Sequence, residues 1–275
     1  MSARITARFA SLRRANRAGL VAYIMASDPD HETCFEILRG LPAAGADVIE
    51  LGFPFTDPMA DGPSIQKAGL RALKAGGSLR KTLDLARRFR ETDKDTPLIL
   101  MGYANPIESM GYDAFANAMY ASGADGAIVV DLPPEEDAPL RAAFTKHDLS
   151  IIRLATPTTD DKRLTKVLDG AAGFLYYVSV AGVTGATAAT SEAVRAAVSR
   201  LKRATDLPIA VGFGVREPEA ARAIAQTADA VVVGSAFVDE IAAGAQAQAA
   251  ERVLRKVQLL SEAVRSARAY EGTPA

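Results

Sequence analysis

The sequence contains little of several residues on which common kinds of site depend. Its single cysteine, Cys34, has no partner for an intrachain disulfide, which fits a reducing cytoplasm. Its only two histidines, His31 and His147, lie in or beside predicted surface helices, so a histidine-based zinc site or a Ser-His-Asp triad is not plausible. We therefore expect neither a metal nor an organic cofactor.

The chain also lacks a charge bias and any long apolar run. Lysine and arginine total 32 against 33 aspartates and glutamates, so no basic face for nucleic acid is implied. No segment approaches the roughly 20 apolar residues that a membrane helix needs, and the first 18 residues lack the apolar core of a signal peptide. We expect a cytoplasmic protein without nucleic-acid or membrane partners.

What the sequence does contain is a regular alternation of short strand-like runs and amphipathic helical stretches. Eight strands separated by helices predict parallel pairing in a (β/α)8 barrel, the TIM barrel fold. An open doubly wound sheet is the alternative, less favoured because no G-x-G-x-x-G follows the first strand. The predicted strands are 21–26, 48–51, 98–101, 126–130, 150–154, 174–178, 208–211 and 230–233, and the predicted helices between them include 31–44, 64–75, 112–122, 135–146, 160–168, 191–203 and 217–226.

We expect a single domain over residues 1–275, because the length and a hydrophobic content of 49% suit one large core. An extra N-terminal helix with Ile5, Phe9 and Leu12 on one face is predicted to lie across the barrel bottom. The expected parts are the N-terminal helix within 1–18, the barrel at 19–245, a C-terminal helix at 246–268 and a tail at 269–275.

Two acidic residues near the second predicted strand are candidates for catalysis. Glu50 lies inside the apolar run Val48 to Leu51, where burial disfavours the charged carboxylate and raises its pKa. Asp61 follows in a proline-broken loop. Two carboxyl groups in different environments can serve as proton donor and proton acceptor at one site. The alternative for Glu50 is a structural ion pair with a nearby arginine.

Further polar residues fall at the carboxyl ends of predicted strands, where barrel enzymes place their chemistry. Tyr103 and Asn105 follow the third strand and Asp131 follows the fourth. Tyr176 and Tyr177 alternate in the sixth strand, so one points into the barrel and the other toward the helices. Ordinary packing is the preferred interpretation for Tyr177.

Glycine clusters after the last three predicted strands indicate a phosphate site. They are Gly182 to Gly185, Gly212 to Gly214, and Gly234-Ser235 at a helix start. Glycines expose backbone N–H groups and a helix start adds a favourable dipole, although each cluster alone could be only a turn. No lysine is placed in a strand for a Schiff base, so the site suits carbon-carbon bond chemistry on a phosphorylated three-carbon chain.

Six ordered motifs together resemble those of the tryptophan synthase alpha subunit family over nearly the whole chain. They are E-L-G-F-P-F-T-D-P-M-A-D-G-P at Glu50 to Pro63, Y-A-N-P at Tyr103 to Pro106, D-L-P-P-E-E at Asp131 to Glu136, Y-V-S-V-A-G-V-T-G-A at Tyr177 to Ala186, V-G-F-G-V at Val211 to Val215 and V-V-V-G-S-A at Val231 to Ala236.

The resemblance implies a retro-aldol cleavage of indole-3-glycerol phosphate to indole and D-glyceraldehyde 3-phosphate, in tryptophan biosynthesis. It makes Glu50 the acid that protonates carbon 3 of the indole ring and Asp61 the acceptor of the indole N–H proton. The substrate-binding positions that it implies are Tyr23, Tyr103, Tyr176, Thr184, Gly185, Gly214, Gly234 and Ser235.

The resemblance also implies a β subunit in an α2β2 heterotetramer, to which the indole passes. Loops 53–62 and 181–190 are expected to be lids, and Val180 departs from a pattern in which arginine is common. The implied interface positions are Pro54, Asp57, Pro58 and Asn105. A stand-alone lyase and a non-catalytic activator of the β subunit are the alternatives, and a phosphate-sugar isomerase on the same barrel is a weaker one.

Overall fold

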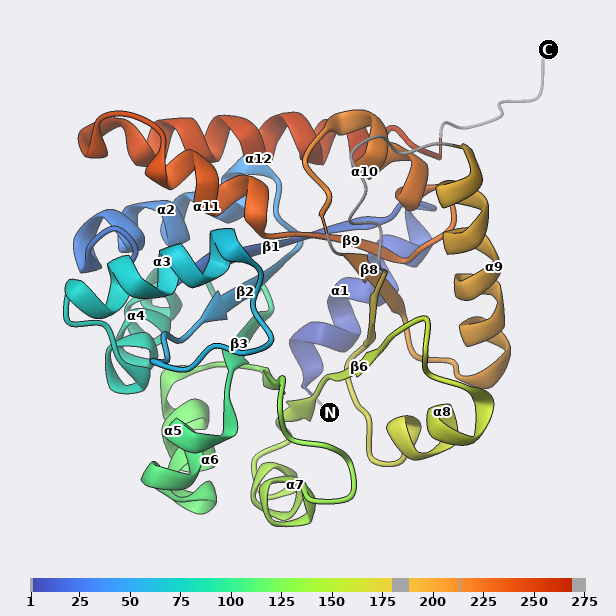
Figure 1. Ribbon diagram of the computed structural model, residues 1–275, viewed down its shortest axis with the longest axis horizontal. Coiled ribbons are helices and arrows are strands. Elements are labelled where there is room, and N and C mark those ends of the chain that lie inside the picture. The colour runs from blue at the N-terminus through green and yellow to red at the C-terminus, as the bar shows by residue number, and fades with distance from the viewer. Residues whose placement is uncertain (1, 180–187, 213, 269–275) are drawn as a thin grey trace.

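The strands form one sheet that curls into a barrel in the computed structural model, which describes residues 2–179, 188–212 and 214–268. Within these residues nine parallel strands follow the order β5-β4-β3-β2-β1-β9-β8-β7-β6, and helices surround them (Figure 1). The two ends of that order, β5 (Ser150–Ile151) and β6 (Arg153–Ala155), are consecutive in the chain. The predicted TIM barrel fold is therefore confirmed.

The eight predicted strand positions are all occupied, but the fifth is divided. A single strand over 150–154 was wrong, because β5 pairs with β4 on one side and β6 pairs with β7 on the other. Between them the Ile152 N–H still donates to the Ala127 carbonyl at 3.0 Å. The remaining strands are β1 (Gly19–Met25), β2 (Val48–Gly52), β3 (Leu98–Gly102), β4 (Gly126–Val129), β7 (Leu175–Val178), β8 (Ile209–Gly212) and β9 (Ala230–Val233).

The helices agree with the prediction at most positions, and α2 and α6 have the predicted bounds. Helix α7 begins at Ala138 rather than Glu135, because Pro139 fits only the first turn of a helix. Helices α4 and α5 are additional to those predicted. The bounds are α1 (Ala3–Arg14), α2 (His31–Ala44), α3 (Pro63–Lys74), α4 (Leu79–Thr92), α5 (Ala104–Met110), α6 (Tyr112–Ser122), α7 (Ala138–Thr145), α8 (Asp161–Leu168), α9 (Ala188–Ala204), α10 (Pro218–Ala225), α11 (Ser235–Ala242), the 3-10 turn η1 (Gln246–Gln248) and α12 (Ala249–Arg265).

Side chains alternate along each strand between the barrel interior and the helix layer. Tyr176 belongs to the interior cluster with Phe174, whereas Tyr177 packs with Val194 and Val198 of α9. The predicted opposite directions of the two tyrosines are confirmed, and so is the packing role of Tyr177. Cys34 is also buried, in α2, where it faces the barrel wall as a free thiol.

Helix α1 closes the amino-terminal end of the barrel. Its buried residues Ile5, Phe9 and Leu12 belong to the same cluster as the inward-facing strand residues, and the Phe9 and Phe174 rings lie 5.6 Å apart. In Figure 1 this helix is seen behind the strands, near the centre of the view. The interior is thus filled from below, and only the carboxyl end of the strands is left open for a site.

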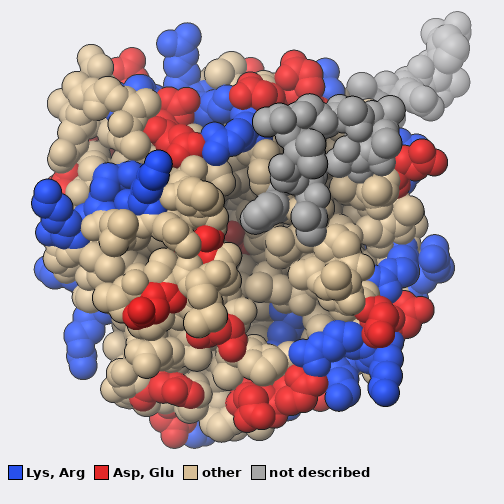
Figure 2. All heavy atoms as spheres, in the orientation of Figure 1, with Lys and Arg blue, Asp and Glu red and all other residues tan. Residues whose placement is uncertain are grey.

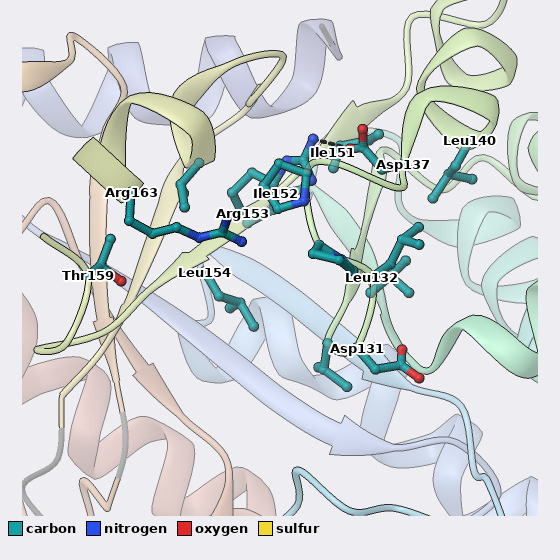
Figure 3. A pocket seen from close by; sticks show the side chains of 15 residues that line it. Asp131, Leu132, Asp137, Leu140, Ile151, Ile152, Arg153, Leu154, Thr159 and Arg163 are labelled. Atoms are coloured by element: carbon teal, nitrogen blue, oxygen red, sulfur yellow. Dashed lines mark hydrogen bonds and ion pairs between the residues drawn. The ribbon is translucent and has the colours of Figure 1, made fainter. Parts of the chain in front are cut away.

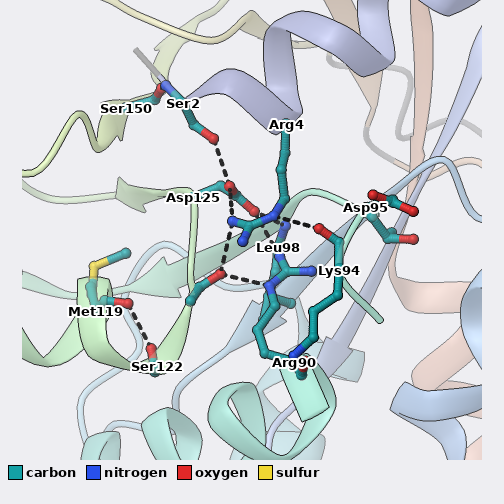
Figure 4. Close-up of polar contacts among 12 residues, drawn as sticks. Ser2, Arg4, Arg90, Lys94, Asp95, Leu98, Met119, Ser122, Asp125 and Ser150 are labelled. Atoms are coloured by element: carbon teal, nitrogen blue, oxygen red, sulfur yellow. Dashed lines mark hydrogen bonds and ion pairs between the residues drawn. The ribbon is translucent and has the colours of Figure 1, made fainter. Parts of the chain in front are cut away.

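A buried polar network around Asp125 fastens this closed end (Figure 4). The Asp125 carboxylate is 1% exposed and accepts hydrogen bonds from Ser2 Oγ at 2.6 Å, Arg4 Nη1 at 2.9 Å and Arg90 Nη2 at 2.7 Å. It also accepts from the Leu98 N–H at 2.9 Å. One carboxylate therefore joins α1, α4 and the start of β3 to the segment before β4.

None of the helices in the described ranges combines the length and apolarity needed to cross a membrane.

We predict that Asp125→Asn lowers the free energy of unfolding by about 3 kcal/mol, because it removes the nearest counter-charge of the buried Arg90 guanidinium and leaves only Asp93 at 3.6 Å. Urea denaturation measures the change. Asp113→Asn is the matched control, since Asp113 is exposed in its ion pair with Lys146 and its substitution should change stability little. Equal midpoints for the two variants would contradict a structural role for the network.

Candidate active site

A cavity of about 580 Å³ opens at the carboxyl ends of the strands. Figure 2 shows this face of the molecule, which is hollowed near its centre and has acidic and basic side chains interspersed around the hollow. The cavity brings together seven of the residues predicted from the sequence, which are Tyr23, Glu50, Asp61, Tyr176, Gly214, Gly234 and Ser235.

Glu50 lies on the floor of this cavity with an unusual environment for a carboxyl group. It is 1% exposed and pairs across the sheet with Tyr23 of β1 and Ile99 of β3. Among the described residues its Oε1 has no hydrogen-bond partner and no arginine is paired with it. Burial alone raises the pKa of Glu50 to about 8. The alternative of an arginine-paired Glu50 was wrong, and the carboxyl group is neutral at pH 7.

Asp61 lies above the floor in the loop between β2 and α3. Burial raises its pKa to about 6, against the opposing effect of a hydrogen bond from the Tyr103 side chain. The Tyr103 hydroxyl also accepts the Ala60 N–H at 3.0 Å, so it fixes the loop next to Asp61. Tyr103 does not line the cavity. It contacts Asp61, which does. Asp61 is mostly ionised at pH 7.

The two cavity tyrosines fit beside glycines that have no side chain to displace them. A Cβ atom at Gly212 would lie 2.7 Å from the Tyr176 hydroxyl, and one at Gly52 would overlap the Tyr23 hydroxyl. Burial raises the pKa of both Tyr23 and Tyr176 well above the ordinary value, so both hydroxyls stay protonated. The two rings add apolar surface to the cavity that Glu50 also lines.

The part of the cavity wall at the start of α11 suits an anion. Gly234 precedes α11, which begins at Ser235, and the first N–H groups of a helix have no intrahelical acceptor. Gly214 has a φ angle of +73°, a left-handed conformation that favours glycine. Backbone N–H groups and a helix dipole are the groups that stabilise a negative charge at a helix start.

Arg216 also lines the cavity, and the sequence analysis missed it. Its Nη1 forms an ion pair with Asp239 Oδ2 at 2.6 Å, and its Nη2 lies 3.5 Å from Ser64 Oγ. Its side chain is 49% exposed, so it remains accessible to an anion in the cavity. The sequence feature that could have identified Arg216 is its position two residues after Gly214, in the same loop.

Arg71 links the helix after the Asp61 loop to the helix that begins at Ser235. It projects from α3, which follows the Asp61 loop, and makes two hydrogen bonds of 2.7 Å to the fully buried Asp28. Its Nη2 also donates to the Val238 carbonyl of α11 at 3.4 Å. Arg71 thereby holds α3, which follows the Asp61 loop, and α11, which begins at Ser235, to the loop after β1.

The predicted interface residues lie outside the cavity lining. Asp57 and Asn105 are exposed and Pro58 is partly exposed, so each presents side-chain surface. Pro54 is buried within the chain, where a Cβ atom at Gly77 would lie 3.1 Å from its ring.

Thr184, Gly185 and Val180 lie outside the described residues, as does most of the predicted lid at 181–190. In the part of the chain that is described, no group of three histidine, cysteine, aspartate or glutamate residues could hold a metal ion.

The fold and this cavity define a TIM-barrel enzyme whose site holds two acidic residues of raised pKa. The family model for the tryptophan synthase alpha chain matches residues 9–268. The chain belongs to this family, whose reaction is the cleavage of indole-3-glycerol phosphate, and the resemblance seen in the sequence is confirmed.

Relatives of known name and structure agree over nearly the full length. The tryptophan synthase alpha chain of Caulobacter sp. (strain K31) is 58% identical over 267 residues, which cover 96% of this chain and 97% of the relative. That of Caulobacter vibrioides (strain NA1000 / CB15N) is 56% identical with the same coverage. The crystal structure of tryptophan synthase subunit alpha from Legionella pneumophila str. Paris superposes with a TM-score of 0.89 at 39% identity, covering 96% of this chain and 98% of that one.

We predict that Glu50→Gln becomes increasingly stabilising as pH rises from 4.5 to 7. The unfolded chain ionises Glu50 near the ordinary pKa of 4.5, whereas the folded chain keeps it protonated up to about 8. The contribution of this group is therefore fully present below pH 4.5 and is lost as pH rises toward 8. The advantage of the glutamine variant should grow by about 3 kcal/mol over that interval.

Chemical denaturation of both proteins across this pH range measures the advantage. Glu91→Gln on the exposed face of α4 is the control, and it should show no such growth. A pH-independent difference between Glu50→Gln and the unsubstituted protein would mean that Glu50 ionises normally in the folded chain.

Proposed function

We propose that this chain cleaves indole-3-glycerol phosphate with Glu50 as the proton donor and Asp61 as the proton acceptor. The observation that carries the proposal is the unequal ionisation of two acids that line one cavity. With pKa values of about 8 and about 6, Glu50 is protonated and Asp61 is ionised at pH 7. A retro-aldol cleavage needs a donor at carbon 3 of the indole ring and an acceptor at its nitrogen, which this pair supplies.

The proton transfers balance over one turnover. Glu50 protonates carbon 3 while Asp61 accepts the ring N–H proton, which converts the indole ring to its indolenine form. The Glu50 carboxylate then takes the proton of the adjacent glycerol hydroxyl, and the bond between carbon 3 and the glycerol chain breaks. The electron pair of that bond restores the aromatic ring as Asp61 returns its proton to nitrogen. Indole and D-glyceraldehyde 3-phosphate leave, and both acids regain their starting states.

The remaining cavity residues bind the two ends of the substrate. Tyr23 and Tyr176 line the same cavity as Glu50 and offer apolar surface to the indole ring. The backbone at Gly214, Gly234 and Ser235 takes the phosphate, and Arg216 adds a positive charge. Tyr103 acts on the substrate indirectly, because its hydroxyl orients Asp61. The family resemblance adds Thr184 and Gly185 to the proposed binding site.

The partner in this proposal is a tryptophan synthase β subunit, in an α2β2 heterotetramer that receives the indole. Met59 supports a docking surface beside the cavity, because its apolar side chain is 80% exposed in the loop that carries Asp61. Asp57, Pro58 and Asn105 add exposed surface, whereas Pro54 shapes the loop from inside. The cytoplasmic location stays a prediction from the sequence.

Indole release from indole-3-glycerol phosphate, by the chain alone and with a β subunit added, tests the function. Release that rises strongly with the β subunit is the expected result. Fast release without the partner would favour a stand-alone lyase. Absence of release under both conditions would leave a non-catalytic activator and overturn the proposal.

We predict a bell-shaped pH dependence of kcat/KM for this release. The rate should rise through about pH 6 as Asp61 ionises and fall above about pH 8 as Glu50 loses its proton. Glu50→Gln should lower kcat by about 10²- to 10⁴-fold, and Asp61→Asn should lower it comparably and remove the acid limb. Turnover by Glu50→Gln within a few-fold of the unsubstituted enzyme would remove Glu50 from the acid role.

We predict that Ser235→Asp raises KM for the phosphorylated substrate by about tenfold or more, through charge repulsion at the start of α11. Arg216→Gln should raise KM less, by a few-fold, because the side chain is half exposed. Arg200→Gln is the matched control, since Arg200 pairs with Asp161 outside the cavity lining. Unchanged KM values for both cavity variants would mean that the phosphate group binds elsewhere.

A further inference from the structure

Asp131 lies in the loop after β4 and takes no part in the proposed proton transfers. It lines a second cavity, of about 380 Å³, where Figure 3 shows its carboxylate turned away from Arg153 and Arg163. Those arginines are paired instead with Asp137 and Glu135. The carboxylate of Asp131 bonds to a different segment of the chain, the one that follows β3.

Two hydrogen bonds from this loop hold the backbone around Tyr103. Asp131 Oδ1 accepts the Ala104 N–H at 2.8 Å. Ala104 is the first residue of α5, and the first N–H groups of a helix have no intrahelical acceptor. The Val130 N–H, in turn, donates to the Gly102 carbonyl at 2.9 Å. The peptide units on both sides of Tyr103 are therefore held by two consecutive residues that follow β4.

Tyr103 reaches from this backbone to the loop that carries Asp61. Its side chain is 2% exposed, and its ring centroid lies 5.3 Å from that of Phe55, near the beginning of the loop. Near the end of the same loop, its hydroxyl accepts the Ala60 N–H at 3.0 Å and donates to the Asp61 carboxylate. One side chain thus contacts the Asp61 loop at two separate points.

Loss of the Asp131 acceptor would loosen Tyr103 at its own backbone. Tyr103 has extended φ and ψ angles of −113° and 155°, and the peptide unit that follows it carries the Ala104 N–H. Without the carboxylate, rotation about this ψ angle displaces the Tyr103 hydroxyl, and hydrogen bonds weaken steeply as their distance and angle change. The bond from Tyr103 lowers the pKa of Asp61, so weakening that bond raises the pKa.

We propose that Asp131 is a positioning residue for the cleavage reaction, which holds Tyr103 in the orientation that hydrogen-bonds Asp61. Asp131 does not line the cavity that Glu50 and Asp61 share, so it acts only through the intervening residues. The contacts run from its carboxylate to Ala104, and from the Tyr103 hydroxyl to Asp61. This role rests on the proposed function, in which Asp61 accepts the indole N–H proton.

The pH dependence of kcat/KM for indole release tests this role. Asp131→Ala removes the acceptor and should shift the acid limb, which reports Asp61, upward by about half a pH unit to one pH unit. Removing a negative charge could by itself only lower the pKa of Asp61, so an upward shift identifies the lost hydrogen bond. Asp131→Asn keeps an oxygen that can accept the Ala104 N–H and should restore the limb of the unsubstituted enzyme.

The other titratable or charged groups around Asp61 are present in both variants. Tyr103 approaches it from the end of β3. The groups that line the cavity with it are Tyr23 of β1, Glu50 of β2, Tyr176 of β7 and Arg216 of the loop after β8.

A double variant shows whether Asp131 acts through Tyr103. Tyr103→Phe removes the hydroxyl itself and should shift the acid limb at least as far as Asp131→Ala does. Asp131→Ala/Tyr103→Phe should shift it no further than Tyr103→Phe alone, because both changes act on one hydrogen bond. Asp160→Ala is the matched control, since Asp160 is also exposed and its Oδ1 accepts a backbone N–H, that of Arg163 in α8, at 2.7 Å. It should leave the limb unchanged.

A ¹³C NMR titration of the Asp61 carboxyl group, identified by its loss in Asp61→Asn, measures the same shift without substrate. It separates the two proposals, because absence of indole release would overturn the proposed function while a raised Asp61 titration in Asp131→Ala would still support the link from Asp131 to Asp61. An Asp61 titration that Asp131→Ala leaves unchanged would overturn the positioning role. Additive shifts in the double variant, or an equal upward shift in Asp131→Asn, would overturn it as well.

Discussion

The neutral, buried carboxyl group of Glu50 is the constraint on which the rest of the site depends. Its pKa is raised because burial disfavours the charged carboxylate and no cation among the described residues is paired with it. The positive charge needed for an anionic substrate must therefore lie elsewhere in the cavity wall, where Arg216 and the start of α11 provide it. In the sheet, β1 lies between β2, which carries Glu50, and β9, which leads to the start of α11, so Tyr23 stands between Glu50 and Gly234.

The two acids are supported by different parts of the structure. Glu50 is fixed within the hydrogen-bonded ladder of β2, whereas Asp61 lies on a loop and depends on Tyr103, which comes from the end of β3. Arg71 then joins the helix that follows this loop to α11 and to Asp28. A change in the position of α11 would therefore be transmitted to the helix after Asp61 through Arg71, through Arg216, which contacts Asp239 and Ser64, and through the packing of Val238 on Ala68 and Ala72.

The sequence was informative wherever a property follows from neighbouring residues. The alternation of strands and helices predicted the barrel, and the apolar run around Glu50 predicted its burial and its raised pKa. The division of the fifth strand depends on pairing with strands distant in the chain, so its local pattern did not indicate it. The contacts of Tyr103 with Asp61 and of Arg153 with Asp137 likewise join separate segments. Arg216 was overlooked because backbone N–H groups alone were judged sufficient for the phosphate.

The glycines at the strand ends make certain positions of the sequence interdependent. Tyr23 occupies the space that a side chain at Gly52 would need, Tyr176 does so at Gly212, and the ring of Phe53 does so at Gly102. An alanine at Gly52 or Gly102 requires the facing ring to become smaller or to move, and one at Gly212 also requires Val232 to move, because a Cβ atom there would lie 2.7 Å from Val232 Cβ. Across related chains these positions should consequently vary as pairs, and an aromatic substrate pocket could be reshaped in evolution only by two coordinated changes at a time.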